Sequence, residues 1–315
     1  MKRTLEPIDL GRVKTYPLAE RPGKVGVAEF AVGWTPGGRF AAFLERLPQL
    51  LAGSDLKDVI AAIISAHRRH HPVIFGLGAH VIKVGLGPNV IDLMRRGIIS
   101  AVALNGAGLI HDLEVAMTGR TSEDVGSALD DGRFGMAGET AAVIQRAVAT
   151  PAAIVEGLGR AAGAAILESG FPFAHYSILA AGARLQTAVT VHVAIGTDII
   201  HMHPGFDAAR TGAASHLDFR LFAAQVARLE GGVFINAGSA VILPEVFLKA
   251  VSLARNLGHR LDAFTTVTLD CIRHYRPMVN VVQRPTARGG RGISLIGHHE
   301  ILLPLVAAGV IEVLG

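Results

Sequence analysis

Residues 73–80 read VIFGLGAH and residues 98–108 read IISAVALNGAG. Each stretch is a short apolar run that ends in a turn of small residues and leads into a segment with helical spacing of apolar side chains. The pattern returns in apolar runs at 189–195, 232–235 and 261–269, with helical segments at 88–96, 109–117, 216–229 and 244–256. Short apolar strands separated by helices are typical of a parallel sheet covered on both faces. The sequence therefore predicts an α/β fold with a Rossmann-like parallel sheet and helices on both faces.

The chain is expected to consist of an N-terminal arm and one domain. Residues 1–38 carry prolines at 7, 17, 22 and 36 and no helical or strand periodicity, which predicts an irregular arm. Two helices are expected between Arg39 and His70, before the first strand. We expect residues 39–315 to form a single α/β domain, in which 285–292 is an Arg- and Gly-rich loop before a final helix.

Composition narrows the class of protein. Half of the 315 residues are apolar and only 5% are aromatic, which suits close packing of helices on a sheet. The formal charge of +4 is spread along the chain, so no nucleic-acid partner is expected. A single cysteine excludes an internal disulfide and favours a cytoplasmic location. No uninterrupted apolar run is long enough to span a membrane, and no signal peptide is expected.

Ligands of open parallel sheets bind outside the carboxyl ends of the strands, where strand-to-helix loops and helix N-termini meet. Five such ends are Gly76–His80, Asn105–Gly108, Gly196–Asp198, Asn236–Ser239 and Thr268–Asp270. Turns need glycine with or without a ligand, but glycine at several strand ends indicates a site for a dinucleotide. No GxGxxG fingerprint stands in its strand-turn-helix context and no Walker loop is present, which disfavours an ordinary Rossmann dehydrogenase and a P-loop enzyme.

Two histidine motifs are candidates for chemistry. His111 begins a helix and could be an acid or base held by Asp112; alternatively, Asp112 and Glu114 complement the helix dipole while His111 faces solvent. His201 and His203 would share one face of an extended segment, which makes a metal-dependent hydrolase a weaker alternative. The pair lacks an assured third ligand, so we assign no metal site.

Two further groups allow a functional and a structural interpretation. Arg284, Arg288 and Arg291 could clamp a phosphate or carboxylate, or could lie in a flexible surface loop. Asp218 follows Ser215 by three residues, a spacing that resembles a helix capping box, so both side chains are expected to be structural.

Residues 73–80 and 98–108, with Asp112 after them, resemble the deoxyhypusine synthases, in which one strand ends in a Thr-Ser-Asn turn and the next in Thr-Thr-Ala-Gly-Gly before an acidic residue. GTDIIH at 196–201 looks like the family's Gly-Asp-Met segment and its following histidine. GVFINAGS at 232–239 looks like its Gly-rich strand end. The resemblance runs in the same order from about residue 70 to about residue 270.

The resemblance implies a deoxyhypusine synthase-like NAD-binding fold, NAD as the cofactor, and a homotetramer with sites at subunit contacts. The contacts that it carries over are Asn105, Gly106, Ala107, Gly108, Asp198, Gly238 and Ser239. Gly78 and His80, at the first strand end, complete the expected cofactor site.

The catalytic half of the family pattern is missing. The family continues with an acidic, Ser- and Gly-rich segment ending in Trp-Gly-Lys, whose lysine forms an imine, whereas residues 270–277 read DCIRHYRP and no lysine follows Lys249. The family's polyamine-binding Asp aligns with the apolar neighbourhood of Val193. We therefore expect an NAD-dependent transferase or oxidoreductase that acts on a different small substrate.

Proton transfer in such an enzyme is expected from four side chains, with Arg284 or Arg291 orienting an anion. The four are His111, Asp112, Asp198 and His201. The alternative is a catalytically silent paralogue that binds a nucleotide or regulates a related enzyme subunit.

Overall fold

The computed structural model describes residues 5–315, and its centre is one sheet of six parallel strands in the order β3-β2-β1-β4-β5-β6. In this Rossmann order the chain builds outward from β1 on one side and then returns to its other side at β4. The predicted parallel Rossmann-like sheet is confirmed. The strands are β1 (Val73–Leu77), β2 (Ala101–Asn105), β3 (Ala188–His192), β4 (Val233–Ala237), β5 (Thr265–Asp270) and β6 (Arg291–Ile296).

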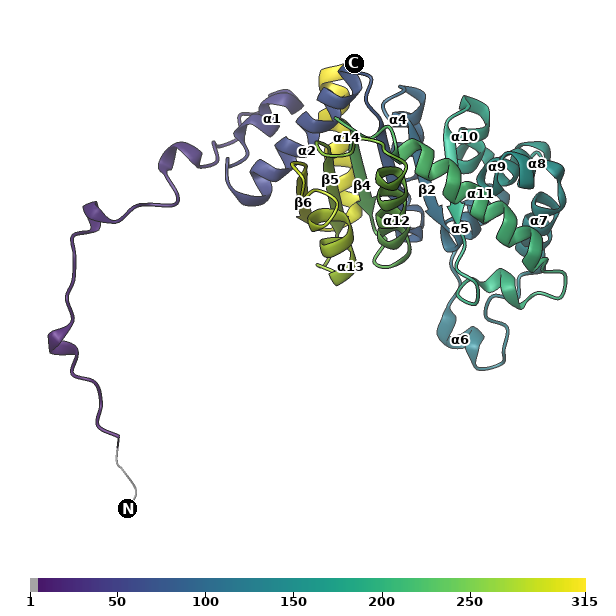
Figure 1. Ribbon diagram of the computed structural model, residues 1–315, viewed down its shortest axis with the longest axis horizontal. Coiled ribbons are helices and arrows are strands. Elements are labelled where there is room, and N and C mark those ends of the chain that lie inside the picture. Colours follow the sequence, from purple (N-terminus) through teal and green to yellow (C-terminus); the bar gives the residue numbers. More distant parts are fainter. Residues whose placement is uncertain (1–4) are drawn as a thin grey trace.

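Helices cover both faces of the sheet (Figure 1). One face packs against α2 (Leu51–Arg68), α5 (Gly106–Thr118) and α14 (His299–Leu314), and the other against α11 (Ala208–Val226) and α12 (Ile242–Asn256). The other helices are α1 (Phe40–Arg46), α3 (Ala79–Lys83), α4 (Gly87–Arg95), α6 (Val125–Leu129), α7 (Gly138–Ala149), α8 (Pro151–Val155), α9 (Leu158–Glu168), α10 (Ile178–Leu185) and α13 (Tyr275–Pro277). A 3₁₀ turn, η5 (Ile199–Met202), follows β3, and a π-helix, η6 (Met278–Gln283), precedes β6.

Strand β1 is buried on both faces, which explains why its sequence is apolar at successive positions. Val73, Phe75 and Leu77 belong to the core under α2 and α14. Ile74 belongs to the second core, where the rings of Phe234 and Phe247 stack with centroids 3.8 Å apart. Each such side chain contributes roughly 1.5–3 kcal/mol by leaving water, so β1 anchors both layers.

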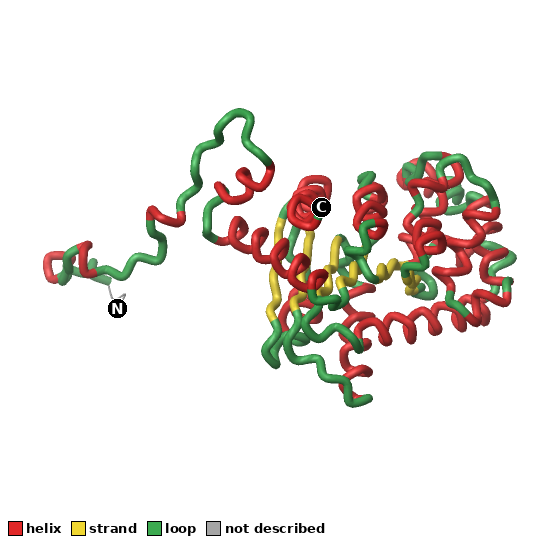
Figure 2. Tube along the Cα trace, turned by 90° about the horizontal axis from the view of Figure 1, so that it is seen from above, coloured by secondary structure: helices red, strands yellow, loops and turns green. Residues whose placement is uncertain are grey.

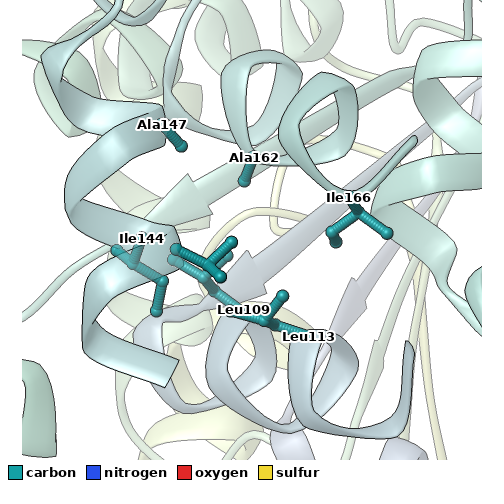
Figure 3. Close-up of a pocket in the computed structure, with 7 residues that line it drawn as sticks. Leu109, Leu113, Ile144, Ala147, Ala162 and Ile166 are labelled. Atoms are coloured by element: carbon teal, nitrogen blue, oxygen red, sulfur yellow. The ribbon is translucent and has the colours of Figure 1, made fainter. Parts of the chain in front are cut away.

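Helices α7 to α10 form a group beyond the β3 end of the sheet (Figures 1 and 2). Between this group and α5 lies an apolar void that is too small to hold a water molecule (Figure 3). Leu109 and Leu113 of α5 face Ile144 of α7 and Ile166 of α9 across it. An apolar space of this size is a packing feature and offers nothing to a ligand.

The N-terminal residues 5–38 lead away from the body of the molecule (Figure 1). They contain three short 3₁₀ turns, η1 (Leu10–Arg12), η2 (Leu18–Glu20) and η3 (Val27–Glu29), and many of their large apolar side chains are exposed. Within residues 5–315, no helix combines the length and the apolar character needed to cross a membrane.

Two sequence expectations are wrong in detail. Strand β6 begins at Arg291, so part of the expected Arg- and Gly-rich loop at 285–292 is sheet. Ser215 and Asp218 lie inside α11, whose N-cap is Asp207, so they form no capping box. Asp218 instead accepts hydrogen bonds from the backbone N–H groups of Val191 (2.7 Å) and Gly159 (2.9 Å), and so joins β3 to the start of α9.

This buried carboxyl group predicts a pH dependence of stability. Burial raises the pKa of Asp218 to about 7, while the amides of Val191 and Gly159 act in the opposite direction. The folded-state pKa of Asp218 lies above that of an unfolded aspartate. The contribution of protonated Asp218 to the unfolding free energy is therefore complete below the unfolded pKa and is lost as the pH rises through about 7. Between about pH 6 and about pH 8 the wild type should lose roughly 1 kcal/mol of unfolding free energy that Asp218→Asn does not lose.

The measurement is urea unfolding of both proteins at the two pH values. His192 titrates in the opposite sense, because burial lowers its pKa to about 3, but it is present in both proteins and cancels in the difference. Equal pH dependence in wild type and variant would contradict the assignment.

Candidate functional site

A pocket of about 630 Å³ opens beside the carboxyl ends of β2 and β3. Its walls are the last residue of α3, one side of α5, the segment 118–140 and residues 197–199, and its volume is in the range of small-molecule sites. Its ionisable and hydroxyl-bearing lining residues are Lys83, His111, Glu114, Thr118, Arg120, Thr121, Ser122, Glu123, Glu139, Thr140, Thr197 and Asp198.

A chain of hydrogen bonds runs along one wall of this pocket. His111 Nδ1 lies 2.6 Å from Thr121 Oγ1, and the Thr121 hydroxyl donates to Glu114 Oε2 at 2.5 Å. Thr140 donates to the other Glu114 oxygen at 3.3 Å. Burial alone would raise the pKa of Glu114, but the nearby imidazole of His111, 3.6 Å from Oε2, and the hydroxyl groups of Thr121 and Thr140 together hold it below its usual value. The chain thus joins an ionised carboxylate to an imidazole that lines the pocket.

The expected pairing of His111 with Asp112 is wrong. Adjacent residues of a helix point in different directions, and Asp112 is turned inward, where it is 1% exposed. There it accepts hydrogen bonds from the Ser177 hydroxyl and from the N–H groups of Ile178 and Leu179, at the start of α10. Burial raises the pKa of Asp112 to about 6, although these donors oppose the shift. Its position is that of a structural anchor for α10.

Asp198 lies in the pocket wall against the N-terminus of α5. A Cβ atom at Gly106 would collide with the Asp198 carboxylate, so a larger residue there would displace this side chain, whose Oδ2 is buried without a hydrogen-bond partner. Burial raises the pKa of Asp198, whereas the charge of His201 and nearby backbone amides lower it.

The neighbouring histidine is fixed at one nitrogen. His201 Nδ1 accepts from the N–H of Gly196 at 3.1 Å, its ring meets Phe206 edge to face at 4.7 Å, and its Nε2 is buried without a partner. The structure therefore places unpartnered polar atoms of both Asp198 and His201 near the start of α5.

The loops after β1 and β4 meet at the point where the strand order reverses. Gly78 donates to Ala237 O at 2.8 Å, and a Cβ atom at Gly78 would stand 2.0 Å from Gly238 O. The rings of His80 and His299 meet at 5.2 Å in the same region. His299 Nε2 lies 3.0 Å from Leu269 O, while its Nδ1 is buried and unpartnered.

The remaining expected cofactor residues lie at the starts of two helices. Asn105 caps α5 by accepting from Gly108 N–H at 2.8 Å, and Ser239 Oγ accepts from Leu243 N–H at 3.1 Å at the start of α12. Ala107 lines the pocket. The nine expected positions thus fall into two groups, one beside the pocket at β2 and β3 and one at the reversal point of β1 and β4.

Helix α3 links the two groups. It begins at Ala79, in the reversal point, and ends at Lys83, which lines the pocket. Lys83 and Arg120 form no ion pair with any residue in 5–315, so two cations of the pocket are available to a ligand.

The arginines expected to orient an anion lie elsewhere. Arg291 begins β6, at the amino end of the sheet, and pairs with Asp58; Arg288 is 3.9 Å from Asp262. Arg284 donates to Asn280 Oδ1 at 2.9 Å. None of them lines the pocket, so the expected anion clamp is wrong.

His201 and His203 turn to different partners, because the segment is a 3₁₀ turn and not an extended strand. His203 Nε2 lies 2.9 Å from Gly135 O. Among the residues that the structure describes, no group of three or more His, Cys, Asp or Glu side chains is placed to hold a metal ion.

Sequence reasoning missed several residues of the pocket. Glu114 could have been found, since it follows His111 by three residues and shares its helix face. Thr121 carries no sequence signal, because it lies beyond the end of α5 at Gly119 and reaches His111 only through the turn of the chain. Lys83 and Arg120 belong to no motif in the sequence, and only the fold places them at one cavity.

No protein-family model matches the sequence, and no curated protein matches it. Solved structures do share its architecture. An unliganded AgrE structure has a TM-score of 0.54 and 15% identity, covering 89% of this chain and 34% of the AgrE chain. A chain from Entamoeba histolytica designated a deoxyhypusine synthase has a TM-score of 0.52 and 10% identity, covering 90% and 96% of the two chains. A conserved LOR/SDH protein from Methanococcus maripaludis S2 has a TM-score of 0.50 and 14% identity, covering 88% and 71%.

These likenesses define an α/β fold with a Rossmann-like parallel sheet. More particularly, this chain shares its fold with the chain designated a deoxyhypusine synthase, as the sequence motifs predict. At such low identities the likeness shows the fold alone, and this chain spans about a third of the AgrE chain.

The structural role of Asp112 is testable. Asp112→Ala removes three accepted hydrogen bonds and leaves buried donors at the start of α10, so it should lower the unfolding free energy by about 3 kcal/mol. Asp92→Ala, which breaks only the exposed pair with Arg96, should cost about 0.5 kcal/mol or less. Chemical denaturation compares the two variants, and similar stabilities would contradict the anchor role.

Proposed function

We propose that this protein is an NAD-dependent enzyme whose small anionic substrate binds in the pocket beside β2 and β3. The reaction transfers a hydride between the substrate and NAD and a proton between the substrate and the protein. The observation that carries the proposal is the placement of the His111–Thr121–Glu114 chain in a pocket that adjoins the strand ends of a Rossmann sheet. His111 is the group proposed to accept or donate the proton. Asp198 lines the same pocket, and its Oδ2 is buried without a hydrogen-bond partner.

Two features of the strand ends support a dinucleotide site. Glycine at Gly78 and Gly106 lets Gly238 and Asp198 approach closely, so that the loops gather at the edge of the sheet where ligands of such folds bind. The buried, unpartnered oxygen of Asp198 suits a donor such as a ribose hydroxyl. The same carboxylate lies at the N-terminus of α5 and would repel a phosphate there, so the phosphates are better suited to the loops after β1 and β4.

The residues proposed to hold NAD are therefore the nine strand-end positions of the sequence analysis, from Gly78 to Ser239. One AgrE structure, with a TM-score of 0.51 and 14% identity over 32% of the AgrE chain, is a ternary complex with ornithine and NAD+. When bound, NAD would supply the hydride acceptor or donor. Neither a nucleic acid nor a membrane is part of the proposal, and the cytoplasm is the proposed location.

The charges of the pocket are mixed, since Glu114, Glu123, Glu139 and Asp198 line it beside Lys83 and Arg120. Glu114 is engaged with Thr121 and Thr140, and Glu123 accepts from Gly135 N–H at 2.8 Å, whereas the two cations have no ion-pair partner among residues 5–315. A carboxylate or phosphate of the substrate would pair with the two free cations. The homotetramer implied by the resemblance belongs to the proposal as well, and the exposed apolar side chains of residues 5–38 suit a contact with another chain.

Binding of the dinucleotide is the first test. NAD or NADH at about 100 times its dissociation constant should raise the unfolding free energy by roughly 2.7 kcal/mol, and ATP or coenzyme A should raise it less. Thermal unfolding with each nucleotide measures the shift. Gly106→Ala should abolish it, because the new methyl group displaces Asp198, whereas Gly212→Ala, at a helical position with open space around it, should leave it unchanged. No shift with any nucleotide would refute the NAD proposal and favour the silent-paralogue interpretation.

The substrate side is tested by screening small acids and their neutral analogues for NAD reduction. Acids should be turned over and their amides or esters should not. For an active acid, Arg120→Ala should raise KM by about tenfold with little change in kcat, because it removes charge-assisted binding and not the proton acceptor. Arg95→Ala, on the surface of α4 and outside the pocket, should change neither constant. Preference for neutral substrates would exclude the anion assignment.

A further inference from the structure

The hydrogen-bond chain along the pocket wall has a direction. An ionised carboxylate only accepts hydrogen bonds, so the Thr121 hydroxyl must donate its single proton to Glu114 Oε2, 2.5 Å away. Its oxygen then faces His111 Nδ1, at 2.6 Å, as an acceptor. Nδ1 must therefore carry a proton, even when the imidazole is neutral.

The opposite nitrogen is free. Among residues 5–315, His111 Nε2 has no hydrogen-bond partner, although the ring lines the pocket. When Nδ1 holds the proton of the neutral ring, Nε2 has the lone pair. The imidazole that lines the pocket thus carries a proton acceptor at Nε2.

We propose that Thr121 and Glu114 are positioning residues that hold neutral His111 in the Nδ1–H tautomer, so that Nε2 is the proton acceptor for the bound substrate. This inference rests on the proposed function for the identity of the reaction, but the tautomer itself is a property of the free protein. Neither residue needs to touch the substrate, since both act through the imidazole.

The chain also limits the movement of the ring. Glu114 is one turn after His111 on α5, and Thr140 of α7 donates to its second oxygen at 3.3 Å. The carboxylate is thereby held between two hydroxyl groups from different segments, 118–125 and α7. Because Glu114 is fixed at both oxygens, Thr121 can fix the imidazole in turn.

The test is ¹⁵N NMR of histidine-labelled full-length protein, without nucleotide or substrate, at a pH where the imidazoles are neutral. The protein has 14 histidines, so the His111 signals are identified by their loss in His111→Ala. The two-bond ¹H–¹⁵N correlations distinguish Nδ1–H from Nε2–H. Wild type and Thr121→Ser, which keeps the hydroxyl, should show His111 with the proton on Nδ1.

Thr121→Val keeps the shape of the side chain and removes the hydroxyl, so His111 should shift toward the Nε2–H form or a mixture of both. Thr121 is only partly buried in a loop, and the amide spectrum reports whether the variant is folded. Thr118→Val is the matched control, because the Thr118 hydroxyl lines the same pocket and bonds to Glu114 O and Arg120 O but not to His111. It should leave the tautomer unchanged.

A wild-type His111 with its proton on Nε2, or a tautomer that Thr121→Val does not alter, would overturn the inference. The failure of nucleotide binding would refute the proposed function and leave this result standing, so the two outcomes are distinguishable. Once an active substrate is found, Thr121→Val should lower kcat by about 10²-fold with little change in KM, and Thr121→Ser should restore it.

Discussion

The direct contact between the loops after β1 and β4 is the constraint on which the rest of the structure depends. Strand β1 pairs with β2 on one side and with β4 on the other. The connection from β1 to β2 therefore crosses one face of the sheet, and the chain that continues from β4 covers the opposite face. Gly78 and Gly238 approach too closely for a side chain at Gly78, and this lets both loops turn away at the same edge. The helices after β1 and β2 consequently lie together on one face. That arrangement brings α3 beside α5, so that residues from two strand ends share one region.

Helix α5 then divides its residues between structure and chemistry. Its inward side carries Asp112, which holds the start of α10, and Leu109 and Leu113, which pack against α7 and α9. Its outward side carries His111 and Glu114, one turn apart. The fixed helix spacing means that neither side can shift without the other. The imidazole is therefore positioned by the same packing that stabilises the domain, which is the form of rigidity that a proton-transfer group requires.

Much of the fold could be predicted from the sequence, because buried strands and amphipathic helices leave strong patterns. The apolar run that begins at Val73 forms strand β1, because Pro72 and Gly78 delimit it. Strand β2 begins later than its apolar run, because Ser100 is tied by its side chain to the backbone of Val73 before the ladder starts. Strand β6 was missed, since Arg291, Gly292 and Ser294 interrupt the apolar pattern of an edge strand that is half exposed. In the candidate site, the strand ends carried a signal in the sequence, but the partner of His111 did not. That partner is Thr121, which approaches His111 through the turn after α5, and the spacing of apolar residues in the sequence does not predict the path of this turn.

The pocket combines two kinds of wall, and this bears on how the chemistry of such a fold can diverge. Asp198 and His111 are held by strand ends and by α5, which belong to the shared architecture. The segment from the end of α5 to the start of α7 supplies Arg120, Thr121, Glu123 and Thr140, and it contributes no strand to the sheet. Changes in that segment can alter the substrate without disturbing the strand ends that suit a dinucleotide, because loops tolerate substitution where the sheet does not. The chain therefore combines glycines at its strand ends with a segment after β5 that contains no lysine, since the two features lie on different elements and are constrained by different contacts.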